Sequence, residues 1–152
     1  MDAPKQSNLH IYIKEMRKQS VTDVVRVCEP TYIASELTTA GIELHEMEYP
    51  DGTSPPKEII ERWLALVDKT FFHTVAEGST PCIAVHCVAG LGRAPVLVAI
   101  ALIEFNNMDP VEAVSLIRRH RRGAINEKQL LYLERYKKSF QRAGDAACCV
   151  IL

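Results

Sequence analysis

The stretch that decides the fold is His86-Cys87-Val88-Ala89-Gly90-Leu91-Gly92-Arg93. It places a cysteine and an arginine six positions apart around a glycine-rich turn. Residues 83–86 are apolar and partly β-branched, which predicts a buried strand, and residues 94–105 predict a helix. A loop between a strand and a helix N-terminus directs backbone N–H groups at an anion, and the helix dipole favours negative charge there. The segment therefore predicts a phosphate-binding loop that also stabilises a cysteine thiolate.

The two reactive residues of this loop suit phosphoryl chemistry. Cys87 supplies a thiolate that can attack phosphorus. The planar fork of Arg93 can hold two phosphoryl oxygens at once and bind them more strongly as charge spreads over them in the transition state. His86 either orders the loop and tunes the thiolate or is an ordinary histidine at the end of a strand. Ala94 follows at the start of the helix.

The loop backbone is expected to bind the phosphate itself. Gly90 and Gly92 permit unusual backbone dihedral angles, so that successive amides can converge on one point. The predicted phosphate-binding segment comprises Val88, Ala89, Gly90, Leu91, Gly92 and Arg93.

The composition is that of a single compact enzyme. The chain has 152 residues, of which 47% are hydrophobic, and a formal net charge of −1. No stretch approaches the ~20 apolar residues of a membrane span, and the first residues resemble neither a signal peptide nor a myristoylation site, so we expect synthesis in the cytosol. The five cysteines lack metal-ligand spacing, and no metal or other cofactor is expected.

Strand-like and helix-like segments alternate along the chain. This alternation predicts a single α/β domain, residues 1–140, whose mostly parallel sheet carries helices on both faces, followed by a C-terminal tail, residues 141–152. Ligands of such sheets bind at the C-terminal ends of the strands, where the Cys87 loop lies. We predict strands at 9–13, 24–28, 43–49 and 83–86, and helices at 55–75, 94–105, 110–119 and 127–140. Asp109 and Asn126 are the predicted N-caps of the last two helices.

A cysteine phosphatase also needs an acid to protonate the leaving oxygen, supplied by a segment that can close over the phosphate. Asp51 is our candidate, because it lies in a loop rich in proline and glycine, residues 49–56. Asp51-Gly52 is also common turn chemistry, so a purely structural role is the alternative. Glu46 and Glu48 are weaker candidates.

The segment from His86 to Ala99 resembles the signature of the phosphatase of regenerating liver family, the prenylated protein tyrosine phosphatases of type IVA. The resemblance covers about residues 20–137. It includes Val25-Arg26-Val27-Cys28-Glu29, Pro55-Pro56, Trp63-Leu64, Arg121-Arg122-Gly123-Ala124 and Lys128-Gln129-Leu130-Leu131-Tyr132-Leu133-Glu134.

The resemblance implies a role for each site residue. Cys87 would be the nucleophile, Arg93 the phosphate ligand and Asp51 the general acid. Cys28 matches the cysteine that forms a reversible disulfide with the catalytic one, which protects the thiolate from irreversible oxidation; without the resemblance it is simply a buried strand cysteine. Ala94 stands where most related phosphatases have a hydroxyl that assists hydrolysis of the phosphocysteine, which implies slow turnover.

The chain departs from the family pattern before Gly52. Pro50 precedes Asp51 where the family has a second aspartate, and one extra residue precedes Pro55-Pro56. Asp51 therefore matches the family pattern only in part, and contacts to the family's partners are expected to be weaker.

The end of the chain predicts lipid attachment. Cys149-Val150-Ile151-Leu152 fits the C-a-a-X prenylation box, and the terminal leucine favours a geranylgeranyl group on Cys149. A frayed apolar tail is the alternative. One prenyl chain anchors a protein only marginally, so a second signal is expected: an acyl group on Cys148, or basic residues, namely Lys137, Lys138, Arg142 and the cluster Arg118-Arg119-His120-Arg121-Arg122. That cluster is equally typical of a solvated helix end.

The expected function is that of a cysteine phosphatase anchored to the cytoplasmic face of the plasma membrane or of endosomes, and cytosolic if unprenylated. Its substrate would be a phosphoprotein or an anionic lipid. The alternative is a binding module, switched by phosphorylation or oxidation of the loop cysteine, that regulates a CNNM-type magnesium transport mediator, a partner that the resemblance implies. Sulfur transfer or arsenate reduction is a third reading. A homo-oligomer is compatible with the sequence, whereas nucleic acid is not an expected partner.

Overall fold

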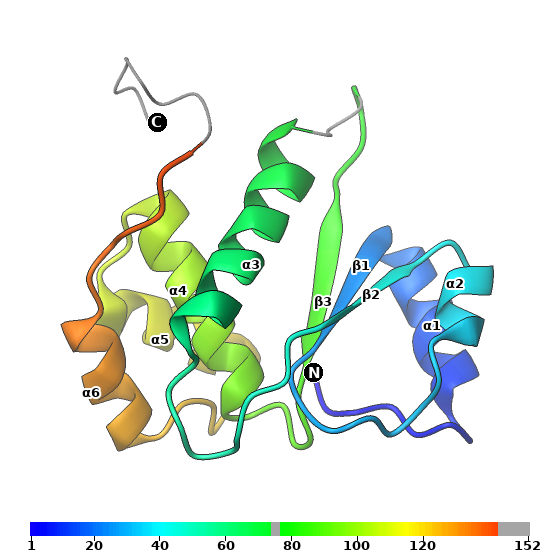
Figure 1. Cartoon of the computed structure of the whole chain (residues 1–152), viewed down its shortest axis with the longest axis horizontal. Helices are drawn as coiled ribbons and strands as arrows, with labels where there is room; N and C mark the ends of the chain where they lie inside the picture. Colours follow the sequence, from blue (N-terminus) through cyan, green and yellow to red (C-terminus); the bar gives the residue numbers. More distant parts are fainter. Residues whose placement is uncertain (74–76, 143–152) are drawn as a thin grey trace.

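The protein is described by a computed structural model that covers residues 1–73 and 77–142 (Figure 1). The elements in chain order are α1 (Leu9–Lys18), β1 (Val21–Arg26), α2 (Ser35–Thr39), β2 (Glu43–Glu46), α3 (Lys57–Asp68), the π-helix η1 (Lys69–His73), β3 (Cys82–His86), α4 (Arg93–Asn106), α5 (Pro110–His120) and α6 (Glu127–Arg135).

The sheet has three parallel strands in the order β2-β1-β3. Val24 of the central strand lies opposite Leu44 on one side and Ala84 on the other. Helices α1 and α2 lie on one side of the sheet and α3 to α6 on the other (Figure 1). This arrangement confirms the predicted α/β class, and it brings the ends of β1 and β3 together below the start of α4.

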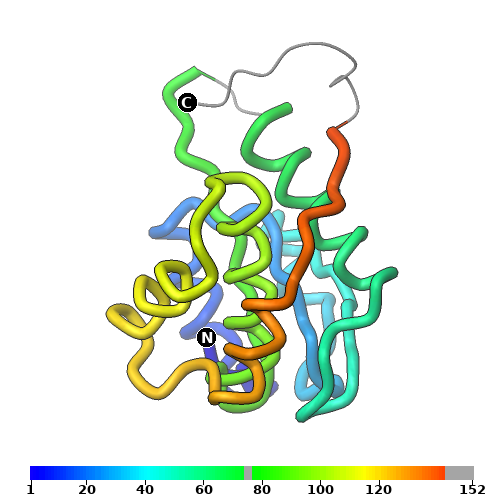
Figure 2. Tube along the Cα trace, turned by 90° about the vertical axis from the view of Figure 1, so that its left-hand side faces the viewer, coloured from blue at the N-terminus to red at the C-terminus, as the bar shows by residue number. Residues whose placement is uncertain are grey.

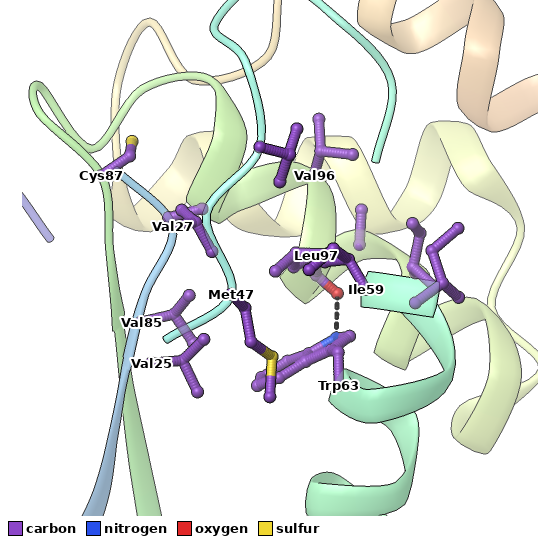
Figure 3. Close-up of a cluster of buried hydrophobic side chains, with 14 of the residues drawn as sticks. Val25, Val27, Met47, Ile59, Trp63, Val85, Cys87, Val96 and Leu97 are labelled. Atoms are coloured by element: carbon purple, nitrogen blue, oxygen red, sulfur yellow. Dashed lines mark hydrogen bonds between the residues drawn. The ribbon is translucent and has the colours of Figure 1, made fainter. Parts of the chain in front are cut away.

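Two hydrophobic clusters hold the layers together. The smaller one packs α1 and α2 on Val24. The larger one packs α3 and α4 on the opposite face, where Val25 and Val85 of the sheet meet Trp63 and Leu97 (Figure 3). The Trp63 indole N–H donates to the Leu97 carbonyl at 2.7 Å, so its polar atom is satisfied inside the core. The position of α4 behind the loop is thereby fixed.

The prediction of a strand at residues 9–13 is wrong, because this segment begins helix α1. A strand that buried Leu9 would also bury Ile11, yet the Ile11 side chain is 59% exposed. Leu9 and Met16, seven residues apart, are the buried pair, which is helical spacing. The helix period therefore prevails over the local alternation.

Two predicted helices end earlier than expected. Helix α3 changes to the π-helical turn η1 after Asp68, whose buried carboxylate lies 2.8 Å from His73 Nε2 and accepts from Arg142 Nε at 2.9 Å. Helix α6 ends at Arg135, because the following residues turn to meet Glu104 of α4. Tyr136 Oη and the Ser139 amide both donate to that carboxylate, at 2.7 and 2.9 Å. In Figure 2 the segment after α6, orange to red, therefore runs alongside α4 and α3.

The other boundaries lie close to those expected. Strand β1 begins at Val21, earlier than predicted, and Cys28 follows its end. The caps predicted for α5 and α6 are confirmed: Asp109 accepts from the Val111 amide, and Asn126 forms a reciprocal capping box with Gln129. None of the helices within the described residues is both long and apolar enough to cross a membrane.

Candidate active site

The loop at residues 87–92 joins the end of β3 to the start of α4, as the sequence predicted. Cys87 and Arg93 are both buried, each with 3% of its surface exposed. Figure 3 shows Cys87 at the border of the large hydrophobic cluster. The thiol and the guanidinium group therefore form the floor of the site, while Val88 and Leu91 face outward, 55% and 38% exposed.

Four consecutive carbonyl groups of this loop are held by donors from outside it. The Ala3 amide donates to Val88 O at 3.0 Å and the Ile125 amide donates to Leu91 O at 2.8 Å. Between them, Arg121 donates from Nη2 to Ala89 O at 2.8 Å and from Nε to Gly90 O at 3.1 Å. Because the C=O and the following N–H of a planar trans peptide point in opposite directions, the amides of residues 89–92 are turned away from these donors. They form a concave set of N–H groups suited to an anion.

Of the two loop glycines, Gly90 is the one that the conformation requires. It has a φ of +71°, in the left-handed region, and a Cβ there would also collide with the Met1 carbonyl. Gly92 caps α4 with φ −118° and ψ −87°, and a Cβ there would lie 3.1 Å from Gln129 Nε2, at the end of a flexible side chain. A side chain at position 90 would push the loop out of this conformation.

The Arg93 side chain is held by two backbone carbonyls, and its Nε is left for a ligand. Its Nη1 donates to Val27 O at 3.3 Å and to Tyr49 O at 3.2 Å, and its own carbonyl accepts from Tyr49 Oη at 2.9 Å. Its Nε is buried and has no hydrogen-bond partner within residues 1–73 and 77–142. A buried N–H donor of this kind is costly unless a ligand accepts from it. The guanidinium group is therefore positioned for an anion above Cys87.

The carboxylate of Asp51 lies at the mouth of the site. Its Oδ1 is 3.5 Å from Arg93 Nε, and its side chain is 78% exposed. The Gly52 amide donates to the same oxygen at 3.1 Å, so the turn chemistry expected as the alternative is present as well. Glu46 is held elsewhere, because both of its oxygens bind the guanidinium group of Arg26. Of these two carboxylates, Asp51 is the one placed to reach a bound phosphate.

His86 lies fully buried below the loop and contacts the backbone of Cys87. Burial lowers the pKa of His86 to about 4, so the imidazole is neutral near pH 7. His86 Nδ1 lies 3.4 Å from the Cys87 carbonyl oxygen, which can only accept, so the imidazole proton is assigned to Nδ1. His86 Nε2 then accepts at 2.6 Å from the Tyr32 hydroxyl, whose pKa burial raises to about 12.

Cys28 lies next to this histidine. Its Sγ is 3.9 Å from His86 Nδ1, and the side chain is fully buried. Burial raises the pKa of the Cys28 thiol, while the positive charge of Arg93 acts in the opposite direction. Cys28 and Cys87 are both free thiols here, so the disulfide between them stays a prediction.

The structure adds site residues that the sequence had not singled out. Tyr32 and Tyr49 support His86 and Arg93 from distant parts of the chain, and Arg121 orients the loop carbonyls. Arg121 belongs to a basic cluster that the sequence suggested for a membrane surface, whereas its side chain serves the loop. Among the described residues, Asp23, Glu43 and His45 form a group of side chains that could hold a metal ion; it lies on β1 and β2, and none of the three belongs to the Cys87 loop.

Comparison with known proteins identifies the type of site. The protein-tyrosine phosphatase family model matches residues 3–136, which is most of the chain. The Leishmania major protein tyrosine phosphatase PRL-1 is 44% identical over all of this chain and 86% of its own length. The human protein tyrosine phosphatase type IVA 3 is 46% identical over 97% of this chain and 86% of its own length. The chain belongs to the type IVA, or PRL, family of protein tyrosine phosphatases.

The fold agrees with this membership. The solved structure of a putative Leishmania major protein tyrosine phosphatase matches with a TM-score of 0.79 and 43% identity, covering 91% of this chain and 86% of that one. The protein is thus a protein tyrosine phosphatase of the PRL family, as the resemblance implied. The residues expected to act in the reaction, Cys87, Arg93 and Asp51, lie together at one site. The predicted prenylation residue Cys149 and its neighbour Cys148 lie outside the described residues.

Proposed function

We propose that this phosphatase hydrolyses phosphate monoesters of phosphoproteins or anionic lipids through a phosphocysteine on Cys87, while anchored to a membrane by a prenyl group on Cys149. The observation that carries the catalytic part is the buried Arg93 Nε, which has no hydrogen-bond partner among the described residues and lies 3.5 Å from the Asp51 carboxylate beside the Cys87 loop. A phosphoryl group bound there meets the nucleophile, the cation and the acid at once.

In the first step, the Cys87 thiolate attacks phosphorus, and an S–P bond forms as the P–O bond to the leaving group breaks. Arg93 and the loop amides bind the phosphoryl oxygens, whose charge they stabilise in the transition state. Protonated Asp51 gives its proton to the leaving oxygen. In the second step, water attacks phosphorus, Asp51 takes a proton from the water, and the S–P bond breaks to release phosphate and the thiolate.

Asp51→Asn tests the acid assignment with two substrates. For phenyl phosphate, whose leaving group is strongly basic, we expect kcat/KM to fall by about a hundredfold or more, because general acid catalysis contributes about 10² to 10⁴. For p-nitrophenyl phosphate, whose leaving group departs readily as an anion, the loss should be far smaller. Glu48→Gln is the matched control and should leave kcat/KM unchanged for both substrates. An equal loss of kcat/KM on both substrates would show that Asp51 is not the general acid.

The membrane anchor is tested by intact mass. The full chain, expressed in a eukaryotic cell, should carry an isoprenoid on Cys149 and sediment with membranes, and Cys149→Ser should abolish both. The phosphatase activity on a soluble aryl phosphate should be unchanged by Cys149→Ser. An unmodified Cys149 in the native protein would contradict the anchoring proposal and leave the catalytic one standing.

A further inference from the structure

A second cavity lies away from the Cys87 loop, in the angle between α3, β3 and α4. It has a volume of about 380 Å³, which is within the range of pockets that hold small organic ligands, about 300 to 1,000 Å³. Its walls are apolar side chains, among them Trp63, Ile83, Val98 and Leu102, and Asn106 is the polar residue at its edge. The cavity is large enough for a ligand and offers it almost nothing to hydrogen-bond.

The rim of this cavity is formed by aromatic side chains that face solvent. Phe71 and Phe72 are 38% and 50% exposed, although both line the cavity. The Phe72 ring stacks on that of Phe105, with 5.4 Å between ring centroids. Exposed aromatic side chains at the edge of an apolar cavity mark a binding surface rather than a satisfied core.

The C-terminal end of the described chain contacts this rim. The last described residue, Arg142, lies with its guanidinium carbon 3.9 Å from the centroid of the Phe72 ring, and its Nε donates to Asp68 at 2.9 Å. Figure 2 shows this segment, in red, reaching the end of α3. Cys149 follows seven residues later, and seven extended residues span up to about 24 Å. The chain between Arg142 and Cys149 is therefore short enough for a group on Cys149 to reach the cavity.

We propose that this cavity shelters the isoprenoid group of Cys149 when the protein is off the membrane; the inference rests on the prenylation proposed above. The peptide of residues 149–152 itself is a poorer occupant, because its backbone N–H and C=O groups would lose their hydrogen bonds in an apolar pocket. An isoprenoid has no such groups.

The cavity and a lipid bilayer would compete for the isoprenoid, and the cavity can compete effectively. A single lipid chain binds membranes only marginally, and a ligand tethered by a short linker sees its site at an effective concentration on the order of millimolar. Even a weak pocket can therefore hold the lipid in competition with a bilayer. Membrane association would then depend on whether the cavity is filled, and not on lipid attachment alone.

The first test uses the purified full chain without its lipid and the probe N-acetyl-S-geranylgeranyl-L-cysteine. Trp63 is the single tryptophan of the chain and lines the cavity, so its emission reports binding directly. We expect a saturable change in emission. Ala101→Phe, which fills the cavity, should weaken binding at least tenfold, and Phe72→Ser, at the half-exposed rim, about fivefold.

Leu131→Ser, which removes a similarly exposed apolar side chain from α6, is the control and should bind the probe like the wild type. Retained activity on an aryl phosphate shows that each variant is folded. No saturable change, or unaltered affinity in both cavity variants, would overturn the proposal. So would a Trp63 emission that depends on protein concentration without probe, since a second copy would then be the occupant.

The second test uses the chain geranylgeranylated in vitro and checked by intact mass. With phosphatidylcholine vesicles, the bound fraction should rise severalfold in Ala101→Phe relative to wild type, because the lipid has lost its shelter. Equal partitioning would overturn the sheltering. If Cys149 does not accept the lipid at all, the proposed anchor fails, whereas a failed probe titration rejects the cavity alone.

Discussion

At the scale of single residues, the reactivity of Cys87 depends on side chains that never touch the substrate. Tyr32, neutral because its pKa is about 12, donates to His86, and His86 faces the carbonyl of Cys87. Tyr49 fixes Arg93 by accepting from its side chain and donating to its carbonyl. Tyr32 and Tyr49 come from positions far from the loop in the chain, so the sequence offered no pattern that would group them with His86 and Arg93.

Ala94 sets the rate of the second step in this account. It is buried at the first turn of α4, and a serine there would offer a hydroxyl to the departing thiolate. We expect Ala94→Ser to raise steady-state kcat severalfold and to lower the amplitude of the phosphoenzyme burst, measured by rapid quench. Ala99→Ser places a hydroxyl elsewhere in the same helix and should change neither quantity. A lower kcat in Ala94→Ser would contradict slow hydrolysis as the limiting step.

At the scale of elements, the phosphate cradle depends on the segment between α5 and α6. Arg121 and Ile125 hold three of the loop carbonyls, and the Gln129 side chain of α6 lies next to Gly92. The loop, the helix behind it and the caps of α5 and α6 could be predicted correctly from the sequence, because residues close together in the chain determine them. The contacts of Arg121 depend on how α5 packs beside the loop, which no local pattern records.

Arg121→Ala tests this dependence. The variant loses two charge-assisted hydrogen bonds to the loop, so we expect kcat/KM to fall about tenfold and the affinity for inorganic phosphate to fall with it. Arg122→Ala removes an exposed neighbour of equal charge and serves as the control. If the two variants lose affinity equally, Arg121 acts through general electrostatic attraction rather than through the loop geometry.

Helix boundaries show where sequence patterns fail. Residues 9–13 alternate like a strand, but the nearby Met16 supplies the helical period that buries α1. Asp68, at the end of α3, accepts from Arg142, 74 residues further along the chain. Glu104 accepts from the amide of Ser139, 35 residues further along, and so redirects the chain after α6. Such ends are set partly by tertiary contacts, because these two buried carboxylates take donors from distant segments of the chain.

At the scale of the whole molecule, the buried neutral His86 makes stability depend on pH. Its pKa is about 4 in the folded protein and about 6.5 in the unfolded chain, so the unfolded state binds more protons between these values. Stability present above pH 6.5 is therefore lost as the pH falls toward 4, by roughly 3 kcal/mol for this group.

Urea unfolding at pH 4 to 7 measures this slope, and His86→Asn, which cannot titrate, should flatten it. If the free energy of unfolding depends on pH in the same way in His86→Asn, groups other than His86 cause the dependence. A slope absent from the wild type would contradict the burial of a neutral His86.

The whole molecule also combines two separate binding regions. The Cys87 loop is polar and lies at the C-terminal edge of the sheet, whereas the apolar cavity lies between α3, β3 and α4. Helix α4 contributes to both, through Arg93 at its start and Leu102 and Phe105 further along. One fold can therefore couple a phosphatase site to a lipid-sensitive surface without an added domain.

The central claim is that Cys87 carries the phosphoryl group. Rapid mixing with p-nitrophenyl phosphate, an acid quench and peptide mass spectrometry measure it directly. We expect a burst of nitrophenol close to one equivalent per active site, with the phosphoryl mass on Cys87 and no burst in Cys87→Ser. Turnover that persists in Cys87→Ser, or a phosphoryl group found on another residue, would contradict it.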